Sequence, residues 1–169
     1  MKLRFPDKLI KPLAAKYQYQ NSDAELNELK PIICKRGSLT LIELELIARW
    51  KSPRSAGHVR KNERAYVKEI TKFSLHGDNE RARIETLTLL SGVSWPMASV
   101  ILHFFHKDPY PILDYRALWS VGAQVPKQYS FDTWWPYVEF CRKIARRSRV
   151  DMRTLDRALW QYSKENQKR

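Results

Sequence analysis

LLSGVSWPMASVIL, residues 89–102, is the most informative local pattern in this chain of 169 residues. Apolar residues precede and follow a short turn over residues 91–94, and Gly92 gives the turn access to backbone conformations that side chains forbid. Pro96 suits the first turn of a helix, where the N–H that proline lacks would have no partner. The segment therefore predicts a helix, a tight turn and a second helix through Phe105, with Val93 packed between the two helices.

The second helix of this hairpin begins with backbone N–H groups that have no partner within the helix. Such groups suit a phosphate, and contacts with phosphates position a protein on a nucleic acid without reading its bases. We therefore expect the hairpin to hold a nucleic-acid backbone. The candidate contact residues are Gly92, Val93, Ser94, Trp95 and Met97.

The rest of the chain carries helix signals and no strand pattern. Thr40 and Glu43 form a capping box before apolar residues at helical spacing, and Pro31 falls inside a predicted helix that it could kink. Helices are expected at about 7–20, 23–37, 41–51, 62–75, 81–90, 95–105, 114–122, 132–147 and 151–164. The prediction is one all-α domain over residues 1–169, with the hairpin at about 87–105 and basic C-terminal helices at about 132–165.

The chain has 31 Lys and Arg residues against 18 Asp and Glu, which gives a formal net charge of +13. Such an excess favours a polyanionic partner. The apolar runs are far shorter than the roughly 20 residues that span a bilayer, and the first ten residues are charged and interrupted by Pro6, unlike a secretory signal. We expect a cytoplasmic protein with no membrane partner, associated with the nucleoid if the cell is bacterial. Its expected partner is nucleic acid, double-stranded DNA above all.

Basic residues concentrate in two places. Residues 142–169 contain ten Lys or Arg and three acids, a net charge of +7, and the densest part holds Arg142, Arg146 and Arg147. A solvated helix face usually mixes both signs, so electrostatic contact with nucleic acid is the preferred interpretation of this stretch. Lys51 and Arg54 flank a helix break and are candidate backbone contacts, although a solvated turn beside a buried tryptophan is the alternative there.

The hairpin resembles the helix-hairpin-helix motif of the DNA glycosylase superfamily, whose pattern is L-P-G-V-G-x-x-T-A. The positions that match are Leu90, Gly92, Val93 and Ala98. The positions that differ are Ser91, Ser94 and Met97, which replace the proline, the second glycine and the threonine of the motif. The resemblance covers residues 87–122, about a fifth of the chain. It implies a helical fold that binds DNA.

A catalytic aspartate follows the hairpin in that superfamily, at the start of the next helix and often within V-D-T-x-V-x-R. The segment YPILDYRAL, residues 110–118, carries Asp114 at this place, so the resemblance implies that Asp114 is the catalytic carboxylate. A carboxylate beside the sugar stabilises an oxocarbenium-like transition state and can deprotonate water. Asp114 also stands where a helix needs an N-cap, and a capping aspartate has no need of a catalytic role.

Base removal also requires that the target base leave the stack and meet aromatic or apolar side chains. The candidates for this pocket are Trp50, Tyr110, Tyr115 and Trp119. Trp50 and Trp119 are also typical core residues, and Tyr115 suits either role.

No cofactor is expected. Pro96 stands at the position of the lysine that gives bifunctional members of the superfamily their lyase step, so no such step is expected. Two cysteines, Cys34 and Cys141, cannot form the four-cysteine cluster that some members carry. We expect both to be buried thiols in a reducing compartment.

Metal ligands are also scarce in the sequence. The resemblance leaves room for a monovalent cation at the hairpin carbonyls. His103 and His106 lie three residues apart, with Asp108 close by, but no further ligand is evident, so no metal site is expected.

Three functions are open on this basis. The resemblance implies a monofunctional glycosylase that hydrolyses the N-glycosidic bond of a damaged or mismatched base, with no obligatory protein partner. The first alternative is a helix-hairpin-helix protein that binds nucleic acid without chemistry, with Asp114 as a cap. The second alternative is a protein-interaction module that uses the aromatic surface.

Overall fold

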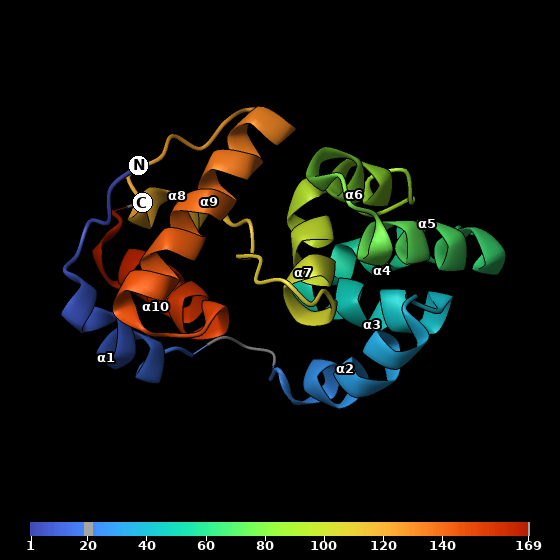
Figure 1. Ribbon diagram of the computed structural model, residues 1–169, viewed down its shortest axis with the longest axis horizontal. Coiled ribbons are helices and arrows are strands. Elements are labelled where there is room, and N and C mark those ends of the chain that lie inside the picture. The colour runs from blue at the N-terminus through green and yellow to red at the C-terminus, as the bar shows by residue number, and fades with distance from the viewer. Residues whose placement is uncertain (19–21, 169) are drawn as a thin grey trace. The chain divides into compact units, whose positions relative to one another are not determined.

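The computed structural model describes residues 1–18 and 22–168, and every regular element in these residues is a helix (Figure 1). The predicted all-α fold class is therefore confirmed. In chain order the elements are η1 (Asp7–Leu9), α1 (Ile10–Ala15), α2 (Ala24–Arg36), α3 (Leu41–Lys51), η2 (Pro53–Ser55), α4 (Ala56–Val59), α5 (Arg64–His76), α6 (Glu80–Leu87), α7 (Trp95–Phe105), α8 (Tyr115–Ser120), α9 (Phe131–Ser148) and α10 (Met152–Asn166). No helix among the described residues has the length and apolar character needed to cross a membrane.

The described residues group into two compact units. The terminal unit contains residues 1–18 and 109–168, with α1, α8, α9 and α10. The central unit contains residues 22–108, with helices α2 to α7. The expectation of a single domain stays a prediction, and each unit is described by itself below.

The local signals for helix starts and stops act as the sequence predicts. Thr40 and Glu43 form the capping box of α3, and the side chain of Asp151 accepts a bond from the Thr154 N–H at the start of α10. Gly37 ends α2 in the left-handed conformation, with φ of +70°. Pro31 lies inside α2, which continues through it to Arg36.

Several boundaries differ from the predictions. α1 ends at Ala15, and the predicted end near Gln20 lies outside the described residues. α6 ends at Leu87, three residues earlier than predicted. α5 begins at Arg64, so Asn62 is not its N-cap; its amide bonds to residues outside the helix. The short helices η2 and α4 occupy a segment that the sequence marks only as a break.

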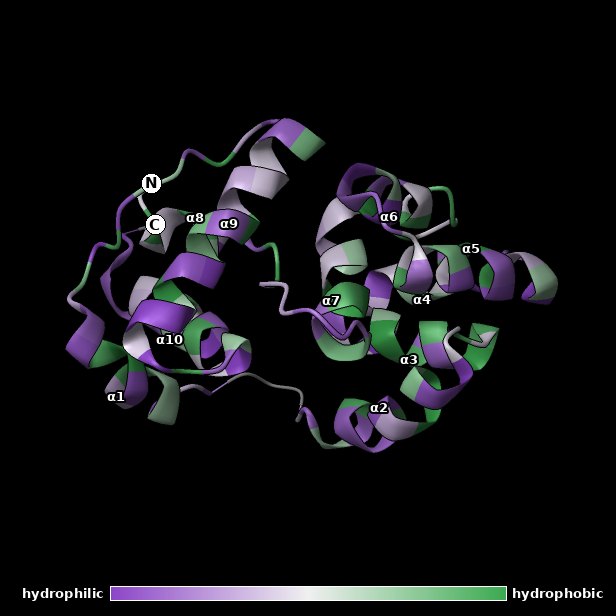
Figure 2. Cartoon of the chain, in the orientation of Figure 1, coloured by the Kyte–Doolittle hydropathy of each residue, from purple (hydrophilic) through white to green (hydrophobic). Residues whose placement is uncertain are grey.

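Each unit has its own core. In the central unit α7 contacts α2, α3 and α6 and buries most of its residues, among them Val100, Ile101 and Leu102. In the terminal unit α10 packs against α1 and α8, and Trp134 and Tyr137 of α9 are fully buried. Hydrophilic and hydrophobic bands alternate along α9 and α10, as expected of helices with one buried face (Figure 2).

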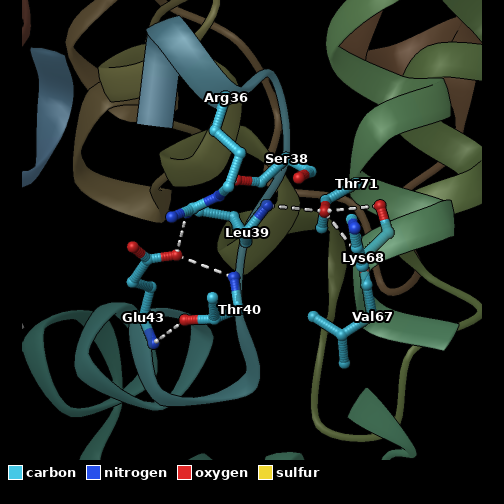
Figure 3. A network of polar contacts seen from close by, with 8 residues as sticks. All are labelled: Arg36, Ser38, Leu39, Thr40, Glu43, Val67, Lys68 and Thr71. Atoms are coloured by element: carbon cyan, nitrogen blue, oxygen red, sulfur yellow. Dashed lines mark hydrogen bonds and ion pairs between the residues drawn. The ribbon is translucent and has the colours of Figure 1, made fainter. Parts of the chain in front are cut away.

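A network of polar contacts fixes the connection between α2 and α3 (Figure 3). The hydroxyl of Thr71 on α5 accepts from the Leu39 N–H at 2.8 Å and donates to the Val67 carbonyl at 2.7 Å. Burial alone would raise the pKa of the Glu43 carboxyl, but bonds from Arg36 and Thr40 outweigh it and hold the pKa below its usual value. The network thus joins α2, α3 and α5, with Thr71 and Leu39 buried and Arg36 and Thr40 at the surface.

Replacing the buried Thr71 by Val keeps the shape of the side chain but leaves the Leu39 N–H without its acceptor. We expect Thr71→Val to lower the free energy of unfolding by about 1–3 kcal/mol, since a buried donor loses its bond. Urea denaturation monitored by circular dichroism measures this. Thr71→Ser keeps the hydroxyl and is the matched control; equal stability of Thr71→Val and wild type would contradict the prediction.

Candidate nucleic-acid interface

The hairpin predicted from the sequence is present within the central unit. α6 ends at Leu87, α7 begins at Trp95, and Gly92 in the turn between them has φ of +81°. The Val93 N–H donates to the Leu90 carbonyl at 3.0 Å, and the side chains of Leu90 and Val93 are buried. The turn therefore has the glycine conformation and the apolar packing that its sequence predicts.

The side chain of Asn62 binds the hairpin turn. Its amide nitrogen donates to the Ser91 carbonyl at 2.9 Å and to the Val59 carbonyl at 2.8 Å. Its amide oxygen accepts from the Ser91 N–H at 2.8 Å. Because the amide pairs with both backbone groups of Ser91, it fixes the plane of the turn against α4. The sequence gives no local signal for this role, since the partners lie 29 positions apart.

Gly92 lies in close contact with the backbone before α5. A Cβ atom added to it would stand 2.9 Å from both Val59 N and Val59 Cγ2, and 3.0 Å from the Ser55 carbonyl oxygen. These are backbone and buried neighbours that cannot give way cheaply. The glycine is therefore required for its conformation and for the space that it leaves.

The hairpin residues predicted to contact nucleic acid differ in exposure. Ser94 is exposed at the N-cap of α7 and makes no side-chain cap bond there, and Trp95 is half-buried. Val93 and Met97 are buried, so their side chains belong to the core, and the predicted contacts of both residues with nucleic acid stay predictions. On the surface of the turn, Ser91 and Ser94 are exposed, and Gly92 and Trp95 are partly exposed.

Basic side chains lie beside the residues that support the turn. Arg54 is exposed and precedes Ser55, whose carbonyl contacts Gly92. Lys61 is exposed and precedes Asn62, whereas Arg60 and Arg49 bind Glu45 and hold the pKa of that carboxyl at about 2. Lys51 is half-buried at the end of α3.

Asp114 is the N-cap of α8, in the terminal unit. Its carboxylate accepts from the Arg116 N–H at 2.9 Å, and the residue is half-buried. Burial and the nearby charge of Asp114 raise the pKa of the Tyr129 hydroxyl. The capping role is thus confirmed as geometry, and the catalytic role stays a prediction.

The four aromatic candidates separate into core and surface. Trp50 is buried edge-on against Phe104, and Tyr110 is fully buried in a stack on Trp134, with ring centroids 5.7 Å apart. Neither presents a face to a flipped base. Tyr115 is 46% exposed, and Trp119 is half-buried.

The C-terminal cations also have contacts within the protein. Arg147 binds Asp7 through two bonds of 2.7 Å, which lower the pKa of that carboxyl. Arg142 lies over the Tyr110 ring at 4.5 Å and donates to the Pro109 carbonyl, so it braces the core. Arg146 is exposed. Of the three C-terminal arginines predicted to contact nucleic acid, two therefore also bind groups of the protein itself.

A pocket of about 420 Å³ lies in the central unit near the C-terminal ends of α2, α5 and α7. His106 is buried in its wall, in contact with Arg83, and burial together with this charge lowers the pKa of His106 to about 4. Within residues 1–18 and 22–168 no group of three or more His, Cys, Asp or Glu is placed to hold a metal ion.

The two cysteines differ in burial. Cys141 is buried, as expected, and burial raises its pKa well above the usual value. Cys34 is exposed, which contradicts the expectation of a buried thiol, and it lines the pocket. Its sulfur donates to the Phe105 carbonyl at 3.5 Å.

Comparison of the chain with protein-family models, with curated proteins and with solved structures found no match. The resemblance to the glycosylase superfamily therefore rests on the residues of the hairpin and of the segment around Asp114.

Gly92→Ala is expected to lower the free energy of unfolding by about 2 kcal/mol or more, because alanine is strained at positive φ and its Cβ would press on Val59 and Ser55. Thermal and urea denaturation measure the loss. Gly57→Ala is the matched control, since no atom lies within 4 Å of the Cβ it adds. Equal stability of Gly92→Ala and Gly57→Ala would refute the prediction that the space beside Gly92 is too small for a Cβ atom.

The lowered pKa of His106 predicts a pH dependence. His106 binds a proton near pH 6.5 in the unfolded chain and near pH 4 in the folded chain. Its neutral, buried form therefore stabilises the fold fully above pH 6.5, and this stability is lost as the pH falls toward 4. The expected loss is up to about 3 kcal/mol. Urea denaturation of wild type and His106→Gln at several pH values measures it, with the exposed His58→Gln as control. A wild-type profile unchanged by His106→Gln would contradict it.

Proposed function

We propose that this protein is a monofunctional DNA glycosylase of the helix-hairpin-helix type. The hairpin of α6 and α7 would hold the DNA backbone, and Asp114 would serve the hydrolysis of the N-glycosidic bond of a damaged or mismatched base. The observation that carries the proposal is the hairpin turn, in which Gly92 adopts a positive φ and packs against Ser55 and Val59.

Two features beside the turn support contact with a DNA backbone. α7 begins directly after the turn, and the first N–H groups of a helix favour an anion. The exposed Arg54 and Lys61 adjoin the residues that support the turn and add positive charge.

Asp114 would supply the chemistry. As the base departs with the bonding electrons, the Asp114 carboxylate would stabilise the positive charge of the sugar. It would then take a proton from the water that adds to the anomeric carbon, and this proton would pass to the departed base, which restores the carboxylate. The cap bond to the Arg116 N–H fixes one oxygen of the carboxylate and so orients the group. Tyr115 and Trp119 are the aromatic candidates that retain some exposure for a flipped base.

A second candidate function is DNA binding without chemistry. The observation that favours it is the confirmed cap at Asp114, which gives this residue a structural role of its own. The burial of Trp50 and Tyr110 also removes half of the aromatic candidates for a base pocket. The two functions share the hairpin and differ in whether Asp114 acts on the sugar.

The variant Asp114→Asn distinguishes the glycosylase from a protein that binds DNA without chemistry. Asparagine is as good an N-cap as aspartate, so the variant is expected to fold and to bind duplex DNA as wild type does. We expect it to remove bases at least about 100-fold more slowly. The assay uses duplexes with alkylated, deaminated, oxidised or mismatched bases, followed by hot alkali to reveal abasic sites.

Asp151→Asn is the matched control, because Asp151 is also a helix N-cap in the same unit and accepts a backbone N–H bond at the start of α10. Base removal by wild type and by Asp151→Asn, but not by Asp114→Asn, would support the glycosylase. Duplex binding that weakens steeply with salt, with no base removal by any variant, would favour the second candidate. Binding that is absent or insensitive to salt would contradict both and favour a protein-interaction module.

A further inference from the structure

The terminal unit carries a row of aromatic rings and guanidinium groups in contact with one another, which the sequence patterns do not reveal. Its members come from the chain after α1, from α8 and from α10. We call it the aromatic–cation row, and it consists of Tyr17, Tyr115, Arg116, Arg153, Arg157 and Trp160.

Consecutive members of the row are in contact. The guanidinium carbon of Arg116 lies 5.2 Å from the centre of the Tyr115 ring and 5.4 Å from that of Trp160, so it joins the two. Trp160 meets Tyr17 edge to face, with centroids 5.2 Å apart. The guanidinium carbon of Arg153 lies 5.3 Å from the centre of the Tyr17 ring.

The regular spacing of α10 produces this arrangement. Arg153, Arg157, Trp160 and Lys164 follow one another at intervals of three or four residues, so they share one face of the helix. Arg157 lies 5.6 Å from the Tyr17 ring, and the exposed Lys164 places its ammonium 5.3 Å from the Trp160 ring.

The charge of the row is positive. Asp156 is buried and pairs with Arg153, and it also accepts from the Ile112 N–H, so it neutralises one cation from below the surface. Glu165 accepts from Gln161 of the same helix. Together with Asp114, which caps α8 beside Arg116, these acids number three, against the four cations Arg116, Arg153, Arg157 and Lys164.

The chemistry of such a row fits one class of polymer. A guanidinium that lies on a ring engages that ring with its face, and its N–H donors point from its edge, where phosphate oxygens bind. Unpaired nucleotides supply flat bases that stack on aromatic rings, together with a phosphate for each base. An acidic peptide matches the charge and supplies no flat rings at regular spacing.

We propose that the aromatic–cation row binds single-stranded nucleic acid, with bases stacking on exposed ring surface and phosphates paired with the cations. Tyr115, at 46% exposure, offers the first stacking platform. This goes beyond the proposed function, because it requires neither the hairpin nor chemistry at Asp114. A strand held here could be undamaged DNA or RNA.

The test measures binding of a fluorescent oligothymidylate of about ten nucleotides, within the range that single-strand sites cover, by anisotropy with the full chain. We expect Tyr115→Ala to raise the Kd about fivefold or more, which is the lower limit for the loss of one stacked base. Tyr115→Phe keeps the ring and should bind as wild type does. Lys164→Ala should also raise the Kd and lower its dependence on salt.

Tyr66→Ala is the matched control, because Tyr66 has similar exposure, 39%, and lies on α5 in the central unit. A wild-type Kd for Tyr115→Ala would overturn the proposal. So would equal competition by poly-glutamate and by unlabelled oligothymidylate, which would point to an acidic protein partner instead.

The same assay distinguishes failure of this proposal from failure of the proposed glycosylase function. Asp114→Asn and Gly92→Ala are expected to bind oligothymidylate as wild type does, whatever they do to base removal or to duplex binding. If Gly92→Ala lost oligothymidylate binding and Tyr115→Ala kept it, the single-strand site would lie at the hairpin. That result would overturn the proposal for the aromatic–cation row.

Discussion

The central unit depends on the close approach of one bare α-carbon to a neighbouring backbone. Gly92 stands against Ser55 and Val59 at distances that exclude a Cβ atom, and Asn62 holds the adjacent Ser91 through both of its backbone groups. The hairpin turn is therefore fixed by close packing and by hydrogen bonds, and both come from residues 55–62. α7, which starts from this turn, carries the apolar residues around which the unit packs.

The elements that could be predicted from the sequence are those specified by neighbouring residues. The capping box at Thr40, the start of α7 at Trp95 and the cap at Asp114 each involve groups within a few positions of one another. Roles that depend on distant partners could not be read in this way. The sequence predicts that Asn62 is an N-cap, and only the structure shows that its amide binds Ser91 in the hairpin. Tyr110 is a pocket candidate in the sequence, and only the structure places it in the core, stacked on Trp134.

Charge illustrates the same difference between composition and structure. The excess of Lys and Arg is evident from the composition, but in the structure several of these side chains bind other groups of the protein. Arg147 ties the last turn of α9 to Asp7, Arg142 covers Tyr110, and Arg83 contacts the backbone at the end of α5. The proposed contacts with nucleic acid thus rest on fewer side chains than the net charge suggests. Their placement beside rings or beside a glycine turn matters more than their number.

The two ends of the chain meet in the same unit. The backbone N–H groups of Lys2 and Arg4 bond to the end of α8, and the Tyr162 hydroxyl holds the Arg4 carbonyl (Figure 1). The central unit is one continuous stretch of chain, whereas the terminal unit closes only when residues far apart in sequence come together. On a ribosome, the central unit is complete while α10 is still being made. Residues 4–15 must wait for that helix, so α1 reaches its packing against α10 only after the whole central unit has been synthesised.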